Sequence, residues 1–342
     1  MSTFSIALKQ SGTWRSVFAL CVLSGAFTAG YKALDNIVVH NYILSEDKAT
    51  AASAYLIVGG WVGVLCGVVF SFFLGRRLID PDFSGFIFRN KRMHIFAALT
   101  GGISALSTLA NLRGNQEADP SVLVVFGGMV FVLTAIYDVV QKQLKFREFL
   151  IPAVISVIGC GLVAFGGSFS GIMVVVVSMI LISNPLNAFN EVLEQRGART
   201  SDGANFFIWR FVWLASVGTV TVILIAVVRG QTGLLGEVTH KAVTTVETMA
   251  FVVATMLFVY LAISLRMVAK KTLGVAVSYV FLLGFSVQAI LAVPITLAGE
   301  VVWPGLFGSV PTDTLVWLVR VAGVLMVCWG IYRLQKMHTR LA

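Results

Sequence analysis

Ala49-Thr-Ala-Ala-Ser-Ala-Tyr-Leu-Ile-Val-Gly-Gly-Trp-Val-Gly-Val-Leu-Cys-Gly-Val-Val-Phe-Ser-Phe-Phe-Leu-Gly75 is a run without a single charged side chain. An α-helix needs about 20 apolar residues to cross the hydrocarbon core of a bilayer, so this run predicts a membrane-spanning helix. The rest of the chain has the same character, because 58% of its 342 residues are hydrophobic, 12% are charged and the mean hydropathy is +0.90. A soluble domain with this composition would lack the polar surface it needs. We therefore expect an all-α polytopic integral membrane protein.

Nine further apolar segments flank this run, separated by short polar loops. The chain is thus predicted to have ten transmembrane helices, near residues 17–39, 51–74, 95–112, 120–140, 149–165, 171–189, 205–228, 246–265, 273–298 and 313–332.

The Lys and Arg residues predict the orientation of these helices, because short loops rich in them stay in the cytoplasm. With the N-terminus inside, eighteen of the 25 Lys and Arg residues, including Arg266, Lys270 and Lys271, fall on the cytoplasmic side. Both termini are therefore predicted to be cytoplasmic, in a multi-pass protein of the plasma (inner) membrane. The net charge of +9 is explained by topology and by contact with anionic membrane lipid, so nucleic acid is not an expected partner.

The chain divides near Gly167 into two similar halves, residues 1–166 and 167–342. Each half opens with a helix that has a polar interior, at residues 26–36 and 182–191. Five helices per half is an odd number, so the second repeat must be inverted relative to the first. Such inverted repeats are typical of secondary transporters, whose sites lie at the repeat interface.

Three stretches resemble a known family: Asp119-Pro-Ser-Val-Leu-Val-Val-Phe-Gly-Gly-Met-Val-Phe-Val-Leu-Thr134, Lys145-Phe-Arg-Glu-Phe-Leu-Ile-Pro152 with Gly159-Cys-Gly161, and Leu297-Ala-Gly-Glu300. They are similar to the fourth, fifth and ninth helices of the drug/metabolite transporter (DMT) superfamily, in particular its EamA-type members. The chain departs from that pattern at Gln141 and Lys142 and in an insertion at residues 301–311. The resemblance implies transport of an amino acid or related organic solute, with exchange of phosphorylated sugars or nucleotide sugars as the alternative.

Polar side chains recur at helical spacing on three of the predicted helices. Because polar groups in membrane helices usually face one another or a water-filled path, we expect the three stripes to meet at one cavity. The stripes are Ser24, Thr28, Lys32 and Asp35; Thr100, Ser104, Thr108 and Asn111; and Ser183, Asn187 and Asn190. The predicted substrate-binding residues are Thr28, Lys32, Asp35, Asn111, Asn187, Asn190 and Arg210. The basic balance of this set favours a solute with a carboxylate or phosphate, moved by alternating access.

Several of these residues also have a structural interpretation. Lys32 and Asp35 could neutralise each other within one helix, and Pro185 could simply kink its helix. Arg210 and Arg320 could extend toward the membrane surfaces, and only Arg210 is retained as a site residue.

A stripe of Gly59, Gly63 and Gly67 predicts close helix packing, either within the chain or in a homodimer. The sequence shows no zinc-protease, nucleophile-elbow or paired-aspartate motif, so we expect neither an enzyme nor a metal or other cofactor. The four cysteines lie in different predicted helices and are expected to be reduced packing residues. A non-transporting accessory subunit is the alternative from another class.

Overall fold

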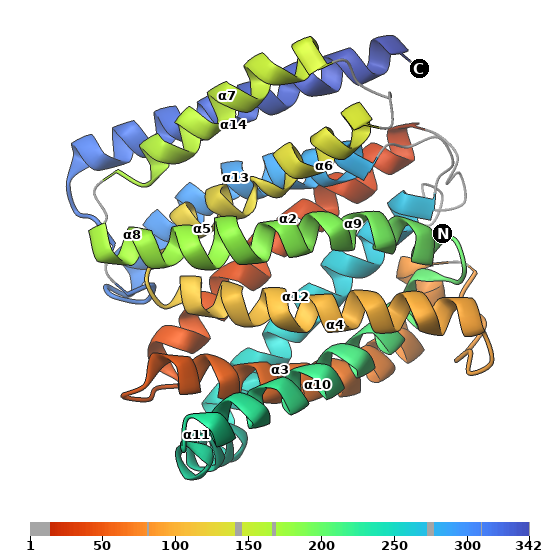
Figure 1. The fold of residues 1–342 in the computed structure, drawn as a ribbon, viewed down its shortest axis with the longest axis vertical. Helices are drawn as coiled ribbons and strands as arrows, with labels where there is room; N and C mark the ends of the chain where they lie inside the picture. The colour runs from red at the N-terminus through yellow and green to blue at the C-terminus, as the bar shows by residue number, and fades with distance from the viewer. Residues whose placement is uncertain are drawn as a thin grey trace.

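The computed structural model describes residues 14–80, 82–140, 146–165, 169–271, 277–308 and 310–341, which form helices and contain no strand (Figure 1). The helical elements and their bounds are α2 (Trp14–Asn41), α3 (Lys48–Phe70), η1 (Ser71–Ile79), α4 (Lys91–Asn115), α5 (Pro120–Gly127), α6 (Val130–Val140), α7 (Phe146–Val163), α8 (Phe169–Val175), η2 (Val176–Ser183), α9 (Asn184–Ala198), α10 (Gly203–Val228), α11 (Thr232–Thr244), α12 (Val246–Lys271), α13 (Val277–Val302) and α14 (Thr314–Leu341).

Within the described parts, eight helical segments are long and apolar enough to cross a membrane. Large apolar side chains also cover the outside of the bundle, such as Leu65 of α3 and Phe72 of η1, which are 67% and 77% exposed. Apolar side chains on the outside of a protein are favourable in contact with lipid chains and unfavourable in contact with water. The protein is therefore an all-α, multi-pass integral membrane protein.

Each predicted transmembrane helix falls on an observed helix, but two of the ten, α7 and α14, contain shorter apolar segments, Leu150–Val163 and Thr314–Gly330. The fourth predicted helix is two elements, α5 and α6, separated at Gly128 and Met129. The sixth comprises α8, η2 and α9 and continues to Ala198, nine residues beyond the predicted end. The eighth, α12, likewise continues to Lys271.

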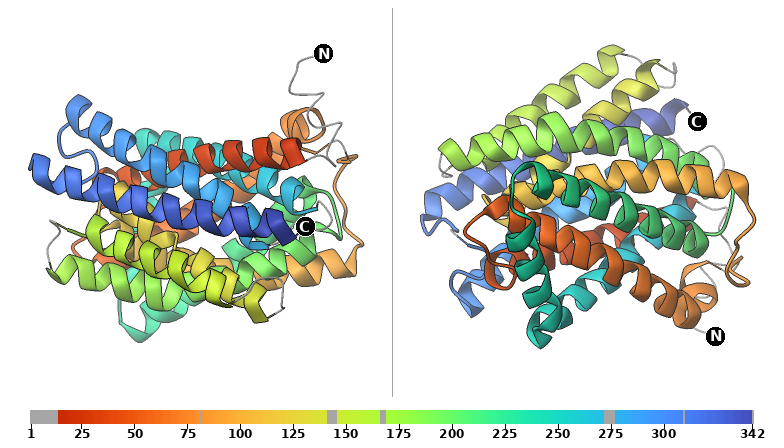
Figure 2. Two further views of the ribbon diagram at one scale, coloured as in Figure 1. Left: turned by 90° about the horizontal axis from the view of Figure 1, so that it is seen from above. Right: turned by 60° about the horizontal axis from the view of Figure 1, so that its bottom comes forward.

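One element has no counterpart among the predicted helices. The short helix α11 runs across the direction of the bundle and packs Leu235, Val238 and Ala242 toward the rest of the chain (Figures 1 and 2). The sequence analysis missed α11 because its 13 residues include Glu237 and Lys241 and resemble a polar loop. The predicted boundary between residues 166 and 167, together with Lys142 and Lys145, lies outside the described residues.

The first and last described residues lie at the same end of the bundle (Figure 2). Several helices from the first half of the chain pack on those from the second: α3 against α10, α5 against α13, and α7 against α14. Helix α2 lies between α12 and α13, where Gly25 and Gly284 bring two backbones into close approach. The pair α7 and α14 lies side by side at one edge of the molecule (Figure 1).

The glycine stripe of α3 packs within the chain. A Cβ atom on Gly63 would lie 2.5 Å from the Phe211 ring, and one on Gly67 would lie 2.9 Å from the Phe207 ring. Both rings belong to α10, so these glycines allow α3 and α10 to approach closely. This contact accounts for Gly63 and Gly67 within the chain.

Candidate functional site

A cavity of about 180 Å³ lies among the membrane helices. Residues from α2, α3, α4, α5, α6, α9, α10, α12 and α13 line it. The described residues of α7 and α14 contribute nothing to its wall. All seven predicted site residues border this cavity: Thr28, Lys32, Asp35, Asn111, Asn187, Asn190 and Arg210. The three predicted polar stripes thus meet at one place.

The polar face of α2 contributes Thr28, Lys32 and Asp35 to the cavity. The Tyr55 hydroxyl of α3 donates a hydrogen bond to an Asp35 carboxylate oxygen. No ion pair within 4.0 Å joins Lys32 to Asp35, although both residues are described. Lys32 and Asp35 therefore attract each other without a direct ion pair, and the hydrogen bond of Asp35 is to Tyr55 of the neighbouring helix α3.

A second polar group connects α4 to the sixth predicted helix. The Ser183 hydroxyl donates to Asn111 Oδ1 at 3.0 Å, and Asn187 Nδ2 donates to Ser183 Oγ at 3.0 Å. Asn184 Nδ2 donates to the Phe126 carbonyl at 2.8 Å, next to the interruption between α5 and α6. Pro185 lies at the start of α9, directly after the π-helical segment η2. The π-helical segment η2 and Asn184 thus lie directly beside Pro185, where the sequence allowed a kink. Short π-helical segments within helices are frequent at functional sites.

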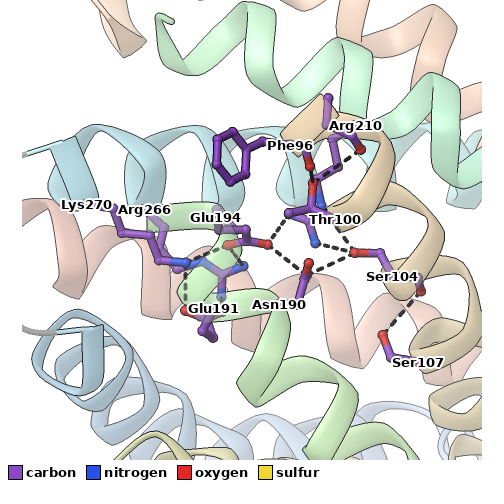
Figure 3. A network of polar contacts seen from close by, with 12 residues as sticks. Phe96, Thr100, Ser104, Ser107, Asn190, Glu191, Glu194, Arg210, Arg266 and Lys270 are labelled. Atoms are coloured by element: carbon purple, nitrogen blue, oxygen red, sulfur yellow. Dashed lines mark hydrogen bonds and ion pairs between the residues drawn. The ribbon is translucent and has the colours of Figure 1, made fainter. Parts of the chain in front are cut away.

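Five charged side chains form a cluster beside the cavity, and four of them, all except Lys270, border it (Figure 3). Glu194 Oε1 lies 2.6 Å from Arg210 Nη1, and Glu194 Oε2 lies 2.5 Å from Lys270 Nζ. Lys270 Nζ also lies 2.7 Å from Glu191 Oε2, and Arg266 Nη1 lies 3.3 Å from Glu191 Oε1. The Glu194 and Lys270 side chains are fully buried. A buried charge is costly unless it is paired, so each carboxylate requires its cations.

Neutral polar side chains extend this cluster toward α4. Arg210 Nη2 donates to Ser104 Oγ at 2.7 Å. Asn190 Nδ2 donates to Ser104 Oγ and to Glu194 Oε1, each at 3.1 Å (Figure 3). The network joins α4, α9, α10 and α12 on one side of the cavity.

No protein-family model and no curated protein matches the chain. A solved structure described only as the crystal structure of a protein is similar over 96% of this chain and 99% of that one, with a TM-score of 0.54 and 13% sequence identity. At that identity the similarity concerns the fold alone. The site is therefore interpreted from its own chemistry.

The sequence analysis missed four members of the charged cluster: Glu191, Glu194, Arg266 and Lys270. It ended the sixth and eighth helices too early, so Arg266 and Lys270 were expected in a loop. The structure places both residues inside α12, where they pair with the two glutamates. A signal was present, because Glu191 and Glu194 continue the polar face that carries Asn187 and Asn190 at helical spacing.

Arg320 does not extend toward a membrane surface, as the sequence analysis had considered; it is buried in the structure. It is 1% exposed, and its Nη1 lies 2.7 Å from Asp119 Oδ2. Its guanidinium also stacks over the Trp317 ring at 5.2 Å. Because Asp119 caps the N-terminus of α5, this pair attaches α14 to the bundle away from the cavity. Arg320 thus has a structural role.

The cavity offers groups that can form hydrogen bonds and ion pairs. Amide, hydroxyl, carboxylate, ammonium and guanidinium groups face one space, together with the rings of Phe211 and Phe285. Among the described residues, no group of three His, Cys, Asp or Glu side chains is placed to hold a metal ion.

Proposed function

We propose that this protein is a secondary transporter that moves a small polar metabolite across the membrane by alternating access. The observation that carries the proposal is the polar cavity inside a bundle of membrane-spanning helices, bordered by helices from both halves of the chain. A transporter requires such a site near the middle of the membrane, reachable in turn from each side.

The energetic argument is that ionisable groups inside a membrane protein are expensive and are usually functional. The stability of the fold alone does not require ionisable groups, because well-packed apolar residues often stabilise a protein as much as a buried ion pair does. Here six ionisable side chains with formal charges, from α2, α9, α10 and α12, border one cavity: Lys32, Asp35, Glu191, Glu194, Arg210 and Arg266. This concentration favours a transporter over an accessory subunit.

Inverted five-helix repeats, as in the DMT superfamily, remain part of the proposal. In two such repeats, each transmembrane helix corresponds to the helix five positions later. Among these corresponding pairs, α3 is in contact with α10 and α7 is in contact with α14. Ten transmembrane helices and cytoplasmic termini in the plasma membrane belong to the same proposal. An amino acid or related organic solute is the substrate that the EamA-type resemblance implies.

Reconstitution of the purified protein in liposomes tests this function. Liposomes preloaded with pooled amino acids, organic acids and sugar phosphates should exchange at least one labelled solute faster than protein-free liposomes. Asn187→Leu, which places an apolar side chain in the cavity, should reduce that flux at least tenfold. Phe189→Leu is the matched control, because Phe189 lies on the same helix and is 58% exposed. Equal flux in both variants would place the transport path elsewhere.

A further inference from the structure

Lys32 is distinguished from the other cations around the cavity because, although Asp35 on the same helix attracts it at longer range, its ammonium makes no hydrogen bond or close ion pair with a described residue. Its side chain is only partly exposed and borders the cavity, yet it has no hydrogen bond or ion pair to any residue that the structure describes. Arg210, Arg266 and Lys270 each lie within 4.0 Å of a glutamate oxygen. The Lys32 ammonium lies beside Gly127, where a Cβ atom would be 3.0 Å from Nζ. The absence of a side chain at Gly127 keeps this approach open.

The charges described around the cavity do not cancel. On the cavity wall itself, Lys32, Arg210 and Arg266 balance Asp35, Glu191 and Glu194. Lys270, fully buried against Glu191 and Glu194, gives these seven side chains together one net positive charge. Because an uncompensated charge is costly in a site removed from water, this excess should attract a counter-ion. Lys32 is the cavity-lining cation whose ammonium makes no hydrogen bond or ion pair within 4.0 Å to a described residue, so it is the one available to bind this counter-ion.

We propose that the cavity binds a solute with one net negative charge, whose anionic group pairs with Lys32. The inference rests on the proposed function of the same cavity and narrows its substrate class. Carboxylate and phosphate groups share the required chemistry, since both accept charge-assisted hydrogen bonds from an ammonium group. The bound complex would be close to neutral, which lowers the cost of closing the cavity around it.

Charge-selective labelling tests the inference before any substrate is identified. Asn187→Cys places a thiol on the cavity wall, and Thr244→Cys places one on the exposed face of α11 as the control. Both are made in a full-length background in which the four native cysteines are replaced by alanine. Each variant is treated with anionic sulfonatoethyl methanethiosulfonate and with its cationic trimethylammonium counterpart. The ratio of the two rates cancels the intrinsic reactivity of each thiol.

The anion-to-cation rate ratio should be about tenfold higher at Asn187→Cys than at Thr244→Cys, as one unpaired charge nearby would produce. Lys32→Gln should remove that preference, Lys32→Arg should keep it, and Lys91→Gln at the exposed start of α4 should leave it unchanged. Equal ratios at the two thiols would overturn the inference, as would a preference that survives Lys32→Gln. Thermal unfolding of each variant shows that the comparison is made on folded protein.

Four related probes then distinguish the anion sources: phenylacetate and methyl phenyl phosphate, which each carry one negative charge, and phenylacetamide and phenethylammonium. At least one of the two anions should slow labelling of Asn187→Cys, and the more effective of them indicates carboxylate or phosphate. Protection by phenethylammonium or phenylacetamide alone would overturn the inference. Transport of solutes with no preference for anions would overturn it while leaving the proposed function intact. Charge-selective labelling without any flux would contradict transport and support anion binding.

Discussion

Glu194 shows how one residue of this protein depends on its neighbours. Its side chain is fully buried, and Arg210, Arg266 and Lys270 all lie within 4.0 Å of its carboxylate oxygens. Removing one member of a buried charged group leaves the others uncompensated, which is more damaging than the absence of the whole group.

Glu194→Gln is therefore expected to lower the free energy of unfolding by about 3–5 kcal/mol. Adding Lys270→Met should recover part of this loss, because the second change removes one of the unpaired cations. Unfolding in detergent, followed by circular dichroism, measures both effects. Glu237→Gln on the exposed face of α11 is the control and should have almost no effect. A Glu194→Gln variant as stable as this control would refute a buried, charge-dependent cluster.

Asp35 is the cavity-lining carboxylate that lies outside the cluster of five charged side chains, and a proton-coupled transporter could use it. Since Asp35 is not paired with Lys32, Asp35→Asn should preserve folding while it flattens the pH dependence of flux in liposomes. Tyr55→Phe removes the hydrogen bond to Asp35 and should alter the same pH profile. Asp313→Asn, an exposed change in the loop before α14, should leave the profile unchanged. An unaltered profile in Asp35→Asn would exclude a proton-carrying role for this residue.

At the scale of helices, close backbone approach determines which elements can pack. A Cβ atom on Gly159 of α7 would lie 2.6 Å from the Gly323 carbonyl of α14, whereas one on Gly161 would meet nothing within 4 Å. The two glycines lie on one helix and therefore form a matched pair.

Gly159→Ala is expected to destabilise the protein by about 1–3 kcal/mol, because backbone atoms of α14 must move. Gly161→Ala should be neutral or stabilising by up to about 1 kcal/mol, since alanine has the higher helix propensity. The difference between the two unfolding free energies is the measurement. Equal effects would mean that α7 and α14 do not pack through these glycines.

The N-terminus of α3 is stabilised by a capping residue outside the membrane span. Asp47 accepts hydrogen bonds from the Thr50 amide at 3.1 Å and from the Thr50 hydroxyl at 2.6 Å, and it pairs with Arg229 at 3.0 Å. Partial burial raises the pKa of the Asp47 carboxyl, but the Thr50 hydrogen bond and the Arg229 guanidinium outweigh this effect and hold that pKa below its usual range.

Asp47→Ala should therefore lower the free energy of unfolding by about 1 kcal/mol near neutral pH. A lowered pKa in the folded state stabilises the protein above the unfolded-state pKa of about 3.9, and this contribution is lost as pH falls through the folded-state pKa. The difference between wild type and Asp47→Ala should thus narrow below about pH 4. Glu46→Ala at the exposed neighbouring position is the control. A difference that grows in acid would contradict the assigned pairing.

At the scale of the whole molecule, topology is the property on which the transport proposal depends. Reporters fused after Arg92 and Arg199 should report the cytoplasm, and those fused after Glu117 and Gln231 should report the opposite side. The physical reason is that Lys and Arg concentrate at one end of the bundle, where both ends of the described chain also lie (Figure 2). Activity of alkaline phosphatase and fluorescence of green fluorescent protein distinguish the two sides. Two reversals among the four positions would exclude inverted repeats.

The sequence by itself determined that this chain lies in a membrane, because long apolar runs such as residues 49–75 cannot be covered in water. It also predicted seven residues that border one cavity, because polar side chains at helical spacing must turn away from lipid. Only the tertiary structure brought Arg266 and Lys270 of α12 against Glu191 and Glu194 of α9. Charged residues near a helix end look like the start of a loop until a partner on another helix is known, since pairing is what makes their burial tolerable. The sequence also could not reveal that Lys32 makes no direct ion pair with Asp35, because that depends on how Asp35 and Tyr55 meet in space.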